Sequence, residues 1–340
     1  MNFNSTEQVL KYISSLVYIK KEKNFTYDKN KKIPEDTNIL YVCEDNFNII
    51  DFPSNIKTLS YQKIKNKKII NFPIKLTYLS LLKCENLIKI PDFPKELLRL
   101  EIDRCENLIE LPEFPKSLLR LEITWCEKLI ELPKFPNELL YIDLHVSENL
   151  TVLPELPSKL VYLSCRSNSI KILPPIPLTV VHLDITFTNI ENLPTLPPKL
   201  IFLSVSGTII KNLPDLPCTL QELDCSQTNI KNLPKLPQGL ISLNYEDSKI
   251  YDLPELPMSL EILKCNDDSI PDILQFPNIN QKHDDEDLAK LMIMYQKSLK
   301  FDEIEKLKKE NEQMKNHILA MPDGKLFFEA REHYKQLTEK

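Results

Sequence analysis

Glycine is nearly missing from this 340-residue sequence, which holds 3 glycines against 26 prolines. A chain with many turns ordinarily makes them with glycine, so another turning device is expected. The three glycines (Gly207, Gly239 and Gly324) are also too scattered to form a glycine-rich phosphate-binding loop. Nucleotide binding through such a loop is therefore excluded.

An excess of positive charge and a long apolar run are missing as well. The net charge is -6 and the pI is about 5.6, unlike the basic footprint of nucleic-acid binders. The basic runs at 20–32 and 63–68 are interpreted as solvated surface. No run of about 18 apolar residues predicts a membrane span, and the N-terminal stretch lacks the features of a signal peptide. We expect neither nucleic acid nor membrane as a partner, and a cytoplasmic location.

The prolines are present because the sequence repeats itself. "CENLIELPEFPKSLLRLEI" at 105–123 is followed by "CEKLIELPKFPNELLYIDL" at 126–144. An apolar residue followed by proline recurs at intervals of 20 or 21 residues, and we call these residues the anchors. The anchors are Phe52, Phe72, Phe93, Phe114, Phe135, Leu156, Ile176, Leu196, Leu216, Leu236, Leu256 and Phe276. Such a period predicts a solenoid, in which each unit buries its apolar face against its neighbours.

Each unit carries the pattern L-x-x-L-x-L-x-x-N/C-x-L, which is that of one leucine-rich repeat. One unit matches it with Leu160, Leu163, Cys165, Asn168 and Ile170. We therefore predict an α/β repeat solenoid: a leucine-rich-repeat horseshoe with a parallel β-sheet on the concave face. The proline-rich "LPELP" segments favour an extended, polyproline-like convex face without true helices.

The N/C position holds small residues that can form hydrogen bonds. Its members are Cys84, Cys105, Cys126, Ser147, Asn168, Thr188, Thr208, Thr228, Ser248 and Asp268. We expect these side chains to satisfy backbone groups where the chain leaves each strand. No cysteine pair has a C-x-x-C spacing, so the cysteines are interpreted as buried thiols and neither a metal nor another cofactor is expected.

The ends of the sequence differ from the repeats. Residues 1–32 are predicted to be an N-terminal helical cap and basic linker, 33–278 a solenoid of about 12 units, and 279–340 a C-terminal helical cap. The C-terminal segment has a helical composition, and dimerisation through it is the alternative to capping.

The units "LPELPSKLVYLSCRSNSIKI" and "LPKLPQGLISLNYEDSKIYD" resemble the short leucine-rich repeats of bacterial secreted effectors of the Yop and Ipa type. The composition, rich in lysine, asparagine and isoleucine, also resembles that of repeat proteins of large amoeba-infecting viruses. The resemblance implies a protein that acts on a host target in the host cytoplasm. Some of these effectors add a ubiquitin ligase domain with a catalytic cysteine, but the last cysteine here is Cys265, inside a repeat.

One exposed position of the strands is rich in rings and arginines, which dominate protein interfaces. We call it the aromatic–arginine column: Tyr78, Arg99, Arg120, Tyr141, Tyr162, His182 and Phe202, followed by Glu222 and Ser242. A protein partner is predicted to bind there. The acids two residues further on, such as Glu101 and Glu122, offer the alternative that the arginines only neutralise them across the sheet.

A second set of residues, directly before this column, is apolar. This apolar column consists of Leu98, Leu119, Leu140, Val161, Val181, Ile201 and Ile241. An apolar run at a surface position indicates that something covers it. The cover is a second copy, the C-terminal helices or the side chains of the next repeat. A self-associating structural protein that uses this column or the C-terminal helices is therefore the alternative function.

Two large residues, Trp125 and Phe187, occupy the loop position after the strand, where they predict an aromatic hot spot for the partner. An enzyme is not expected, because His145 and His182 fall in different columns of non-adjacent repeats. We predict neither a catalytic residue nor a small-molecule substrate, and the sequence does not fix the oligomeric state.

Overall fold

A computed structural model describes residues 5–16, 24–28, 32–43, 52–147 and 149–266 of the chain. Two compact units are distinguished, residues 1–286 and 287–340. The second unit lies outside the described residues, and so do the C-terminal cap predicted at 279–340 and the end of the predicted solenoid.

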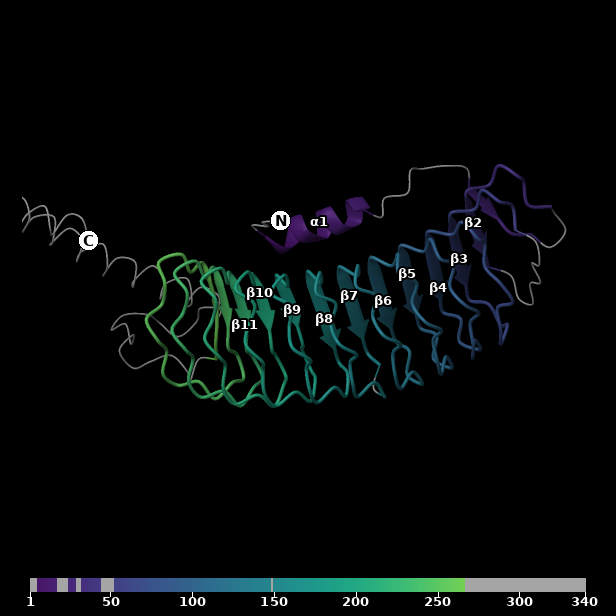
Figure 1. Ribbon diagram of the computed structural model, residues 1–340. Helices are drawn as coiled ribbons and strands as arrows, with labels where there is room; N and C mark the ends of the chain where they lie inside the picture. Colours follow the sequence, from purple (N-terminus) through teal and green to yellow (C-terminus); the bar gives the residue numbers. More distant parts are fainter. Residues whose placement is uncertain (1–4, 17–23, 29–31, 44–51, 148, 267–340) are drawn as a thin grey trace, which may run out of the picture. The chain divides into compact units, whose positions relative to one another are not determined.

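The described chain forms one sheet of 13 parallel strands that follow one another in chain order (Figure 1). The strands are β1 (Asn24–Thr26), β2 (Ile39–Val42), β3 (Thr58–Gln62), β4 (Tyr78–Leu82), β5 (Arg99–Asp103), β6 (Arg120–Thr124), β7 (Tyr141–His145), β8 (Tyr162–Arg166), β9 (His182–Asp184), β10 (Phe202–Ser204), β11 (Glu222–Asp224), β12 (Ser242–Asn244) and β13 (Ile262–Lys264). Equivalent residues of successive repeats pair directly, as Ile142 does with Leu163. The parallel-strand solenoid is confirmed, and it begins earlier than the sequence predicts, because β1 lies within the predicted linker.

The core contains the apolar residues of the repeat pattern. Leu160, Leu163 and Cys165 are fully buried, as is Ile170 after the turn. The anchors Phe72, Phe93, Phe114 and Phe135 stack on one another with ring centroids 6.2 to 6.4 Å apart. We call each repeat of the solenoid, with its strand and turns, a rung. Each rung buries the same set of positions against the rungs on either side, as the repeat pattern predicts.

Two devices replace glycine in the turns. The first is a turn closed by the proline after each described anchor: the Leu160 N–H donates to the Pro157 carbonyl at 2.9 Å, and the Leu200 N–H donates to the Pro197 carbonyl at 3.1 Å. The anchor Phe276 lies outside the described residues. Among the described residues, α1 (Thr6–Leu16) is the only helix. The polyproline-like conformation of the segments that connect the strands stays a prediction.

The second device is a left-handed residue that follows ten of the strands, directly after β3 to β8 and three residues after the end of β9 to β12. These residues are Lys63, Lys83, Arg104, Trp125, Val146, Ser167, Phe187, Gln227 and Asp247, with φ between 52° and 55°, and Gly207, with φ 65°. Side chains other than glycine and asparagine rarely adopt this conformation, because it brings Cβ close to the backbone. A hydrogen bond to the next rung holds it in place, as the Trp125 N–H donates to the His145 carbonyl at 2.9 Å.

Val146 is the least suited of these residues, because its side chain branches at Cβ and its φ is 52°. We expect Val146→Asn to raise the free energy of unfolding by about 1 kcal/mol, since asparagine tolerates the left-handed region. Thermal unfolding of the full chain measures this. Val152→Asn is the matched control, because Val152 is 69% exposed and is not left-handed. Equal melting temperatures for wild type and Val146→Asn would contradict the strain assigned to this turn.

Most described members of the N/C position form side-chain hydrogen bonds with the backbone, as predicted. The exception is the buried Ser147 hydroxyl, which has no partner, and Asp268 lies outside the described residues. Asn168 is buried, and its Oδ1 accepts the Ser147 N–H at 2.9 Å while its Nδ2 donates to the Leu144 carbonyl at 3.0 Å. In later rungs a threonine hydroxyl donates to the carbonyl three residues earlier, as Thr188 does to Ile185 at 2.7 Å. The cysteines at this position are buried free thiols.

Helix α1 packs on the middle rungs of the sheet, whereas the sequence predicts a cap at its end. The buried residues Val9 and Ile13 form one apolar cluster with Val161, Val181 and Ile201, which belong to those middle rungs. The physical reason is that these rungs offer a continuous apolar surface beside their strands. The helix therefore covers part of the strand face instead of capping the sheet.

Candidate functional site

The aromatic–arginine column is brought together as predicted, because its residues are the first residues of their strands. The parallel register pairs Tyr78 with Arg99, Arg99 with Arg120 and Arg120 with Tyr141. It continues through Tyr162 and His182 to Phe202. Neighbouring strands lie about 4.8 Å apart, so equivalent side chains must lie against one another.

Four rings of this column form a continuous stack. The centroids of Tyr141 and Tyr162 are 4.3 Å apart, those of Tyr162 and His182 4.1 Å, and those of His182 and Phe202 4.2 Å. The ring planes differ by 10° or less. The stack fixes the orientation of each ring and leaves little rotamer freedom, so a partner would meet a pre-organised surface.

The two arginines extend this stack. The Arg99 guanidinium lies 4.7 Å from the centroid of the Tyr78 ring, and that of Arg120 lies 4.2 Å from the centroid of Tyr141. Both also pair with Glu122, at 3.0 Å from Arg99 and 2.6 Å from Arg120. The charge pairing that the sequence offers as an alternative is therefore present, and it holds the guanidinium groups in place over the rings.

Exposure divides the column into open and closed parts. Tyr141 is only 4% exposed and His182 only 6%. Tyr78, Arg99, Arg120, Tyr162 and Phe202 are half-buried. A direct contact between a partner and Tyr141 or His182 is therefore obstructed in this conformation, although the sequence places both residues on the open face.

At Tyr141 the obstruction comes partly from α1. The cluster around Val9 and Ile13 includes Tyr141, and Leu10, Tyr12, Leu140 and Tyr162 pack against it. The helix thus covers the apolar column at β7 to β10. The sequence analysis proposes a second copy, the C-terminal helices or the next repeat as the cover of this column, and does not include α1. The sequence does contain a signal for this contact, because α1 and the apolar column are both apolar surfaces that need to be covered.

His182 is held neutral inside the stack. Neither of its ring nitrogens has a hydrogen-bond partner. Burial, followed by the nearby positive charge of Arg166, lowers the pKa of His182 to about 3. A buried imidazole between two rings serves as a flat packing surface at neutral pH, and nothing beside it resembles a catalytic pair.

The opposite edge of the strand face carries Trp125 and Phe187, the two residues predicted as a hot spot. They are 41% and 53% exposed, and both are left-handed turn residues. The Arg104 guanidinium lies 5.8 Å from the centroid of the Trp125 ring. The Phe187 ring lies over Gly207, where an added Cβ would overlap it. We call Arg104, Trp125, Val146 and Phe187 the rim.

Between the rim and the aromatic–arginine column lies a band of hydroxyl and carboxylate groups. The Thr186 hydroxyl donates to Asp184 Oδ1 at 2.6 Å, and the Ser226 hydroxyl donates to Asp224 Oδ1 at 2.7 Å. Burial raises the pKa of the Asp143 carboxyl. Asp184 and Asp224 are already paired within the sheet, whereas the buried Oδ1 of Asp143 has no hydrogen-bond partner. The band therefore offers polar contacts to a partner without an assembled acid–base pair.

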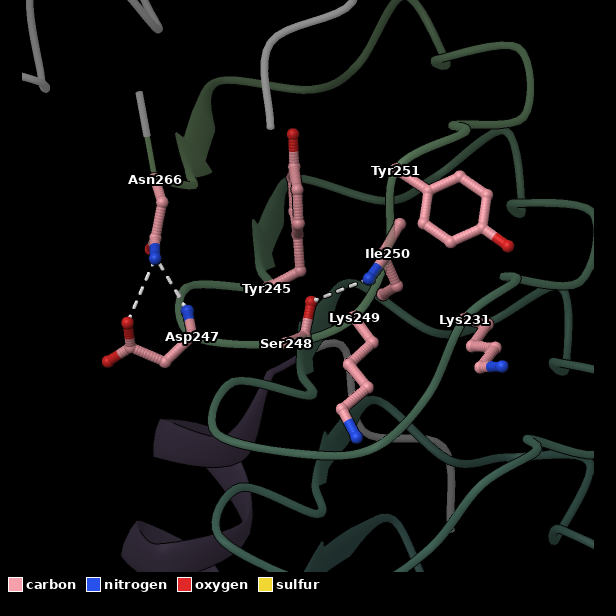
Figure 2. Close-up of a pocket in the computed structure, with 8 residues that line it drawn as sticks. All are labelled: Lys231, Tyr245, Asp247, Ser248, Lys249, Ile250, Tyr251 and Asn266. Atoms are coloured by element: carbon pink, nitrogen blue, oxygen red, sulfur yellow. Dashed lines mark hydrogen bonds between the residues drawn. The ribbon is translucent and has the colours of Figure 1, made fainter. Parts of the chain in front are cut away.

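A hollow of about 400 Å³ lies near the last described rungs (Figure 2). Its lining residues are Lys231, Tyr245, Asp247, Ser248, Lys249, Ile250, Tyr251 and Asn266. Asn266 Nδ2 donates to Asp247 Oδ1 and the Asp247 N–H donates to Asn266 Oδ1, both at 2.9 Å. Asn266 is the last described residue. Asp247 and Asn266 are thus already paired with each other, and we assign no function to this hollow.

The described part of the chain holds neither a cluster of metal ligands nor a helix that could span a membrane. Within residues 5–266, apart from the gaps given above, no three histidine, cysteine, aspartate or glutamate side chains are grouped to hold a metal ion. The helix in that part is too short and too polar to cross a membrane.

The sequence matches no protein-family model and no curated protein. Among solved structures, YopM from Yersinia enterocolitica is similar with a TM-score of 0.53 and 24% identity, over 75% of this chain and 64% of that one. YopM from Yersinia pestis, a leucine-rich effector protein, is similar with a TM-score of 0.51 and 26% identity, over 71% of this chain and 82% of that one. This chain thus spans less than two thirds of the Yersinia enterocolitica protein. The likeness supports a leucine-rich-repeat solenoid that resembles those of effector proteins.

Proposed function

We propose, starting from this resemblance to leucine-rich effector proteins, that the chain is a non-catalytic module that binds a protein partner on its strand face. The partner is proposed to contact the rim and the open part of the aromatic–arginine column. The proposal places the chain in the cytoplasm, and in that of a host if it acts as an effector or viral product.

The exposed aromatic side chains of the rim carry this proposal. Trp125 and Phe187 expose 41% and 53% of their surface, yet their turns are fixed by hydrogen bonds to the next rung. A large ring on a rigid support loses little conformational entropy on binding. The polar band and the half-buried Arg99 and Arg120 beside them match the mixed composition of a protein interface.

Catalysis has no comparable support in the described residues. His145 and His182 belong to different columns, and the paired carboxylates repeat one structural position. A catalytic site needs a nucleophile or base with its orienting partner, and the described residues assemble no such combination. A surface function is therefore favoured over a pocket function.

The expected result of Trp125→Ala with Phe187→Ala is a loss of partner affinity of about tenfold or more, because truncation of hot-spot rings typically costs above 1 kcal/mol each. Affinity capture from host-cell cytosol, followed by titration of the captured protein, measures this. The folded state of each variant is checked by thermal unfolding.

Ile172→Ala with Tyr251→Ala is the matched control, because these residues are 78% and 68% exposed and lie outside the strand face. Capture must survive in this control. Equal capture by the wild type and the rim variant would overturn the rim assignment. Tyr141→Ala is a poorer test, because Tyr141 is buried beneath α1 and its truncation disturbs packing as well as binding.

A further inference from the structure

Helix α1 has one apolar face, and the side chains described on that face pack against the sheet. Val9 and Ile13 have no exposed surface, and Leu10 and Tyr12 are partly buried against the same cluster. Glu7, Gln8, Lys11 and Ser14 are exposed on the other side. Four residues of a helix advance about 6 Å, close to the spacing of about 4.8 Å between strands. The spacing of Val9 and Ile13 therefore suits a helix that runs across successive strands of the sheet.

The surface under α1 is not part of the solenoid core. Residues of the apolar column beneath the helix are almost buried, with Val161 8%, Val181 3% and Ile201 3% exposed. Equivalent residues away from the helix, Leu98 and Leu119, are half-buried. Leu140, which packs against the cluster, is also half-buried. The position is thus most deeply buried where its residues join Val9 and Ile13 in one cluster.

The apolar column is longer than the helix that covers it. The 11 residues of α1 extend about 16 Å. The column from Leu98 to Ile201 crosses the strands β5 to β10, which at about 4.8 Å per strand amounts to about 24 Å. A longer helix would cover Leu98 and Leu119 in addition to the residues that α1 covers.

We propose that the apolar column is a helix-binding groove and that α1 is a resident occupant, displaced by an amphipathic helix of a partner protein. The incoming helix carries aliphatic residues one turn apart, as Val9 and Ile13 are, and has about 16 residues or more to cover the full column. An isolated 11-residue helix is marginally stable, so α1 depends on its docking contacts and can be displaced. The inference rests on the proposed function and specifies what the strand face recognises.

The test uses two labelled peptides and fluorescence anisotropy. The first copies residues 5–16, and the second extends that sequence to about 18 residues with the same aliphatic spacing, long enough to cover the full column. The full chain with Val9→Asp and Ile13→Asp releases its own α1, while Gln8→Asp with Ser14→Asp adds the same charges on the exposed side. If α1 occupies the groove about nine-tenths of the time, the released variant binds either peptide about tenfold more tightly than wild type does.

Substitutions on the sheet side locate the binding. We expect Val181→Asp in the released variant to abolish binding of both peptides, and Leu119→Asp to weaken only the longer one. Circular dichroism and thermal unfolding confirm that each variant is folded, and Leu119→Asp provides the test on the sheet side if Val181→Asp is not. Equal peptide affinity for wild type and the released variant overturns the proposal, and so does binding that no sheet-side substitution changes.

A second copy of the chain is the competing occupant. If wild type doubles its mass with concentration and the released variant does not, α1 is exchanged between copies and the partner assignment is wrong. Peptide binding does not use the rim, so Trp125→Ala with Phe187→Ala should leave it unchanged. Failure of the groove and failure of the rim are therefore separate results.

Discussion

Replacing His182 by phenylalanine is expected to remove a large part of the acid sensitivity of this protein. In the folded chain the pKa of His182 is lowered to about 3, first by burial and then by the positive charge of Arg166. In the unfolded chain a histidine titrates near pH 6.5. Between these two values the unfolded state binds a proton that the folded state does not bind.

The sign of the effect follows from this difference. The contribution of His182 to stability is complete above about pH 6.5 and is lost as the pH falls toward 3, at about 1.4 kcal/mol per pH unit. At pH 4.5 the wild type should have lost about 2.5 kcal/mol through this residue. Phenylalanine keeps a ring between Tyr162 and Phe202 and cannot take up the proton.

Urea unfolding of wild type and His182→Phe at pH 7 and pH 4.5 measures this difference. Comparing the two proteins cancels the carboxylates, including Asp143, whose pKa burial raises. His145→Asn is the matched control, because the burial that lowers the pKa of His145 is less complete. If wild type and His182→Phe lose the same free energy of unfolding between pH 7 and pH 4.5, the ring stack does not exclude the proton.

The second large effect is expected at Asn168. Asn168→Leu removes the acceptor for the Ser147 N–H and the donor to the Leu144 carbonyl, and both pairs are buried. Each unpaired buried group costs about 1 to 3 kcal/mol, so we expect the free energy of unfolding to fall by about 3 kcal/mol. Chemical denaturation of the full chain measures it.

Asn168→Thr is the matched control for that loss. Threonine occupies the same position in the next rung, where the Thr188 hydroxyl donates to the Ile185 carbonyl at 2.7 Å. We expect this variant to lose less stability than Asn168→Leu, because a hydroxyl can still serve one carbonyl. A loss as large in Asn168→Thr as in Asn168→Leu would contradict the role given to the buried hydrogen bonds.

The positions that repeat along the chain could be predicted from the sequence. The burial of Leu160 and Leu163 and the hydrogen bonds of Asn168 each depend on neighbours one rung away. A period of 20 or 21 residues identifies those neighbours, because stacking places equivalent residues against one another. The order of the aromatic–arginine column followed from the same argument.

The features that depend on contacts outside the repeat could not be predicted in this way. The burial of Tyr141 results partly from α1, which lies more than a hundred residues earlier in the chain. The left-handed conformation of Trp125 and Val146 opposes their own preferences and is held by hydrogen bonds between rungs. The short strand β1 has only three residues, too few to produce a clear alternating pattern.

The claim that the strand face binds a protein is tested most directly by photo-crosslinking from single positions. Benzoylphenylalanine replaces Phe187 on the rim in one protein and Tyr251 outside the strand face in another; both side chains are exposed aromatics. After incubation with host-cell cytosol and irradiation, we expect a partner to be linked from position 187 and not from position 251. Crosslinks to that partner from position 251 alone would contradict binding on the strand face.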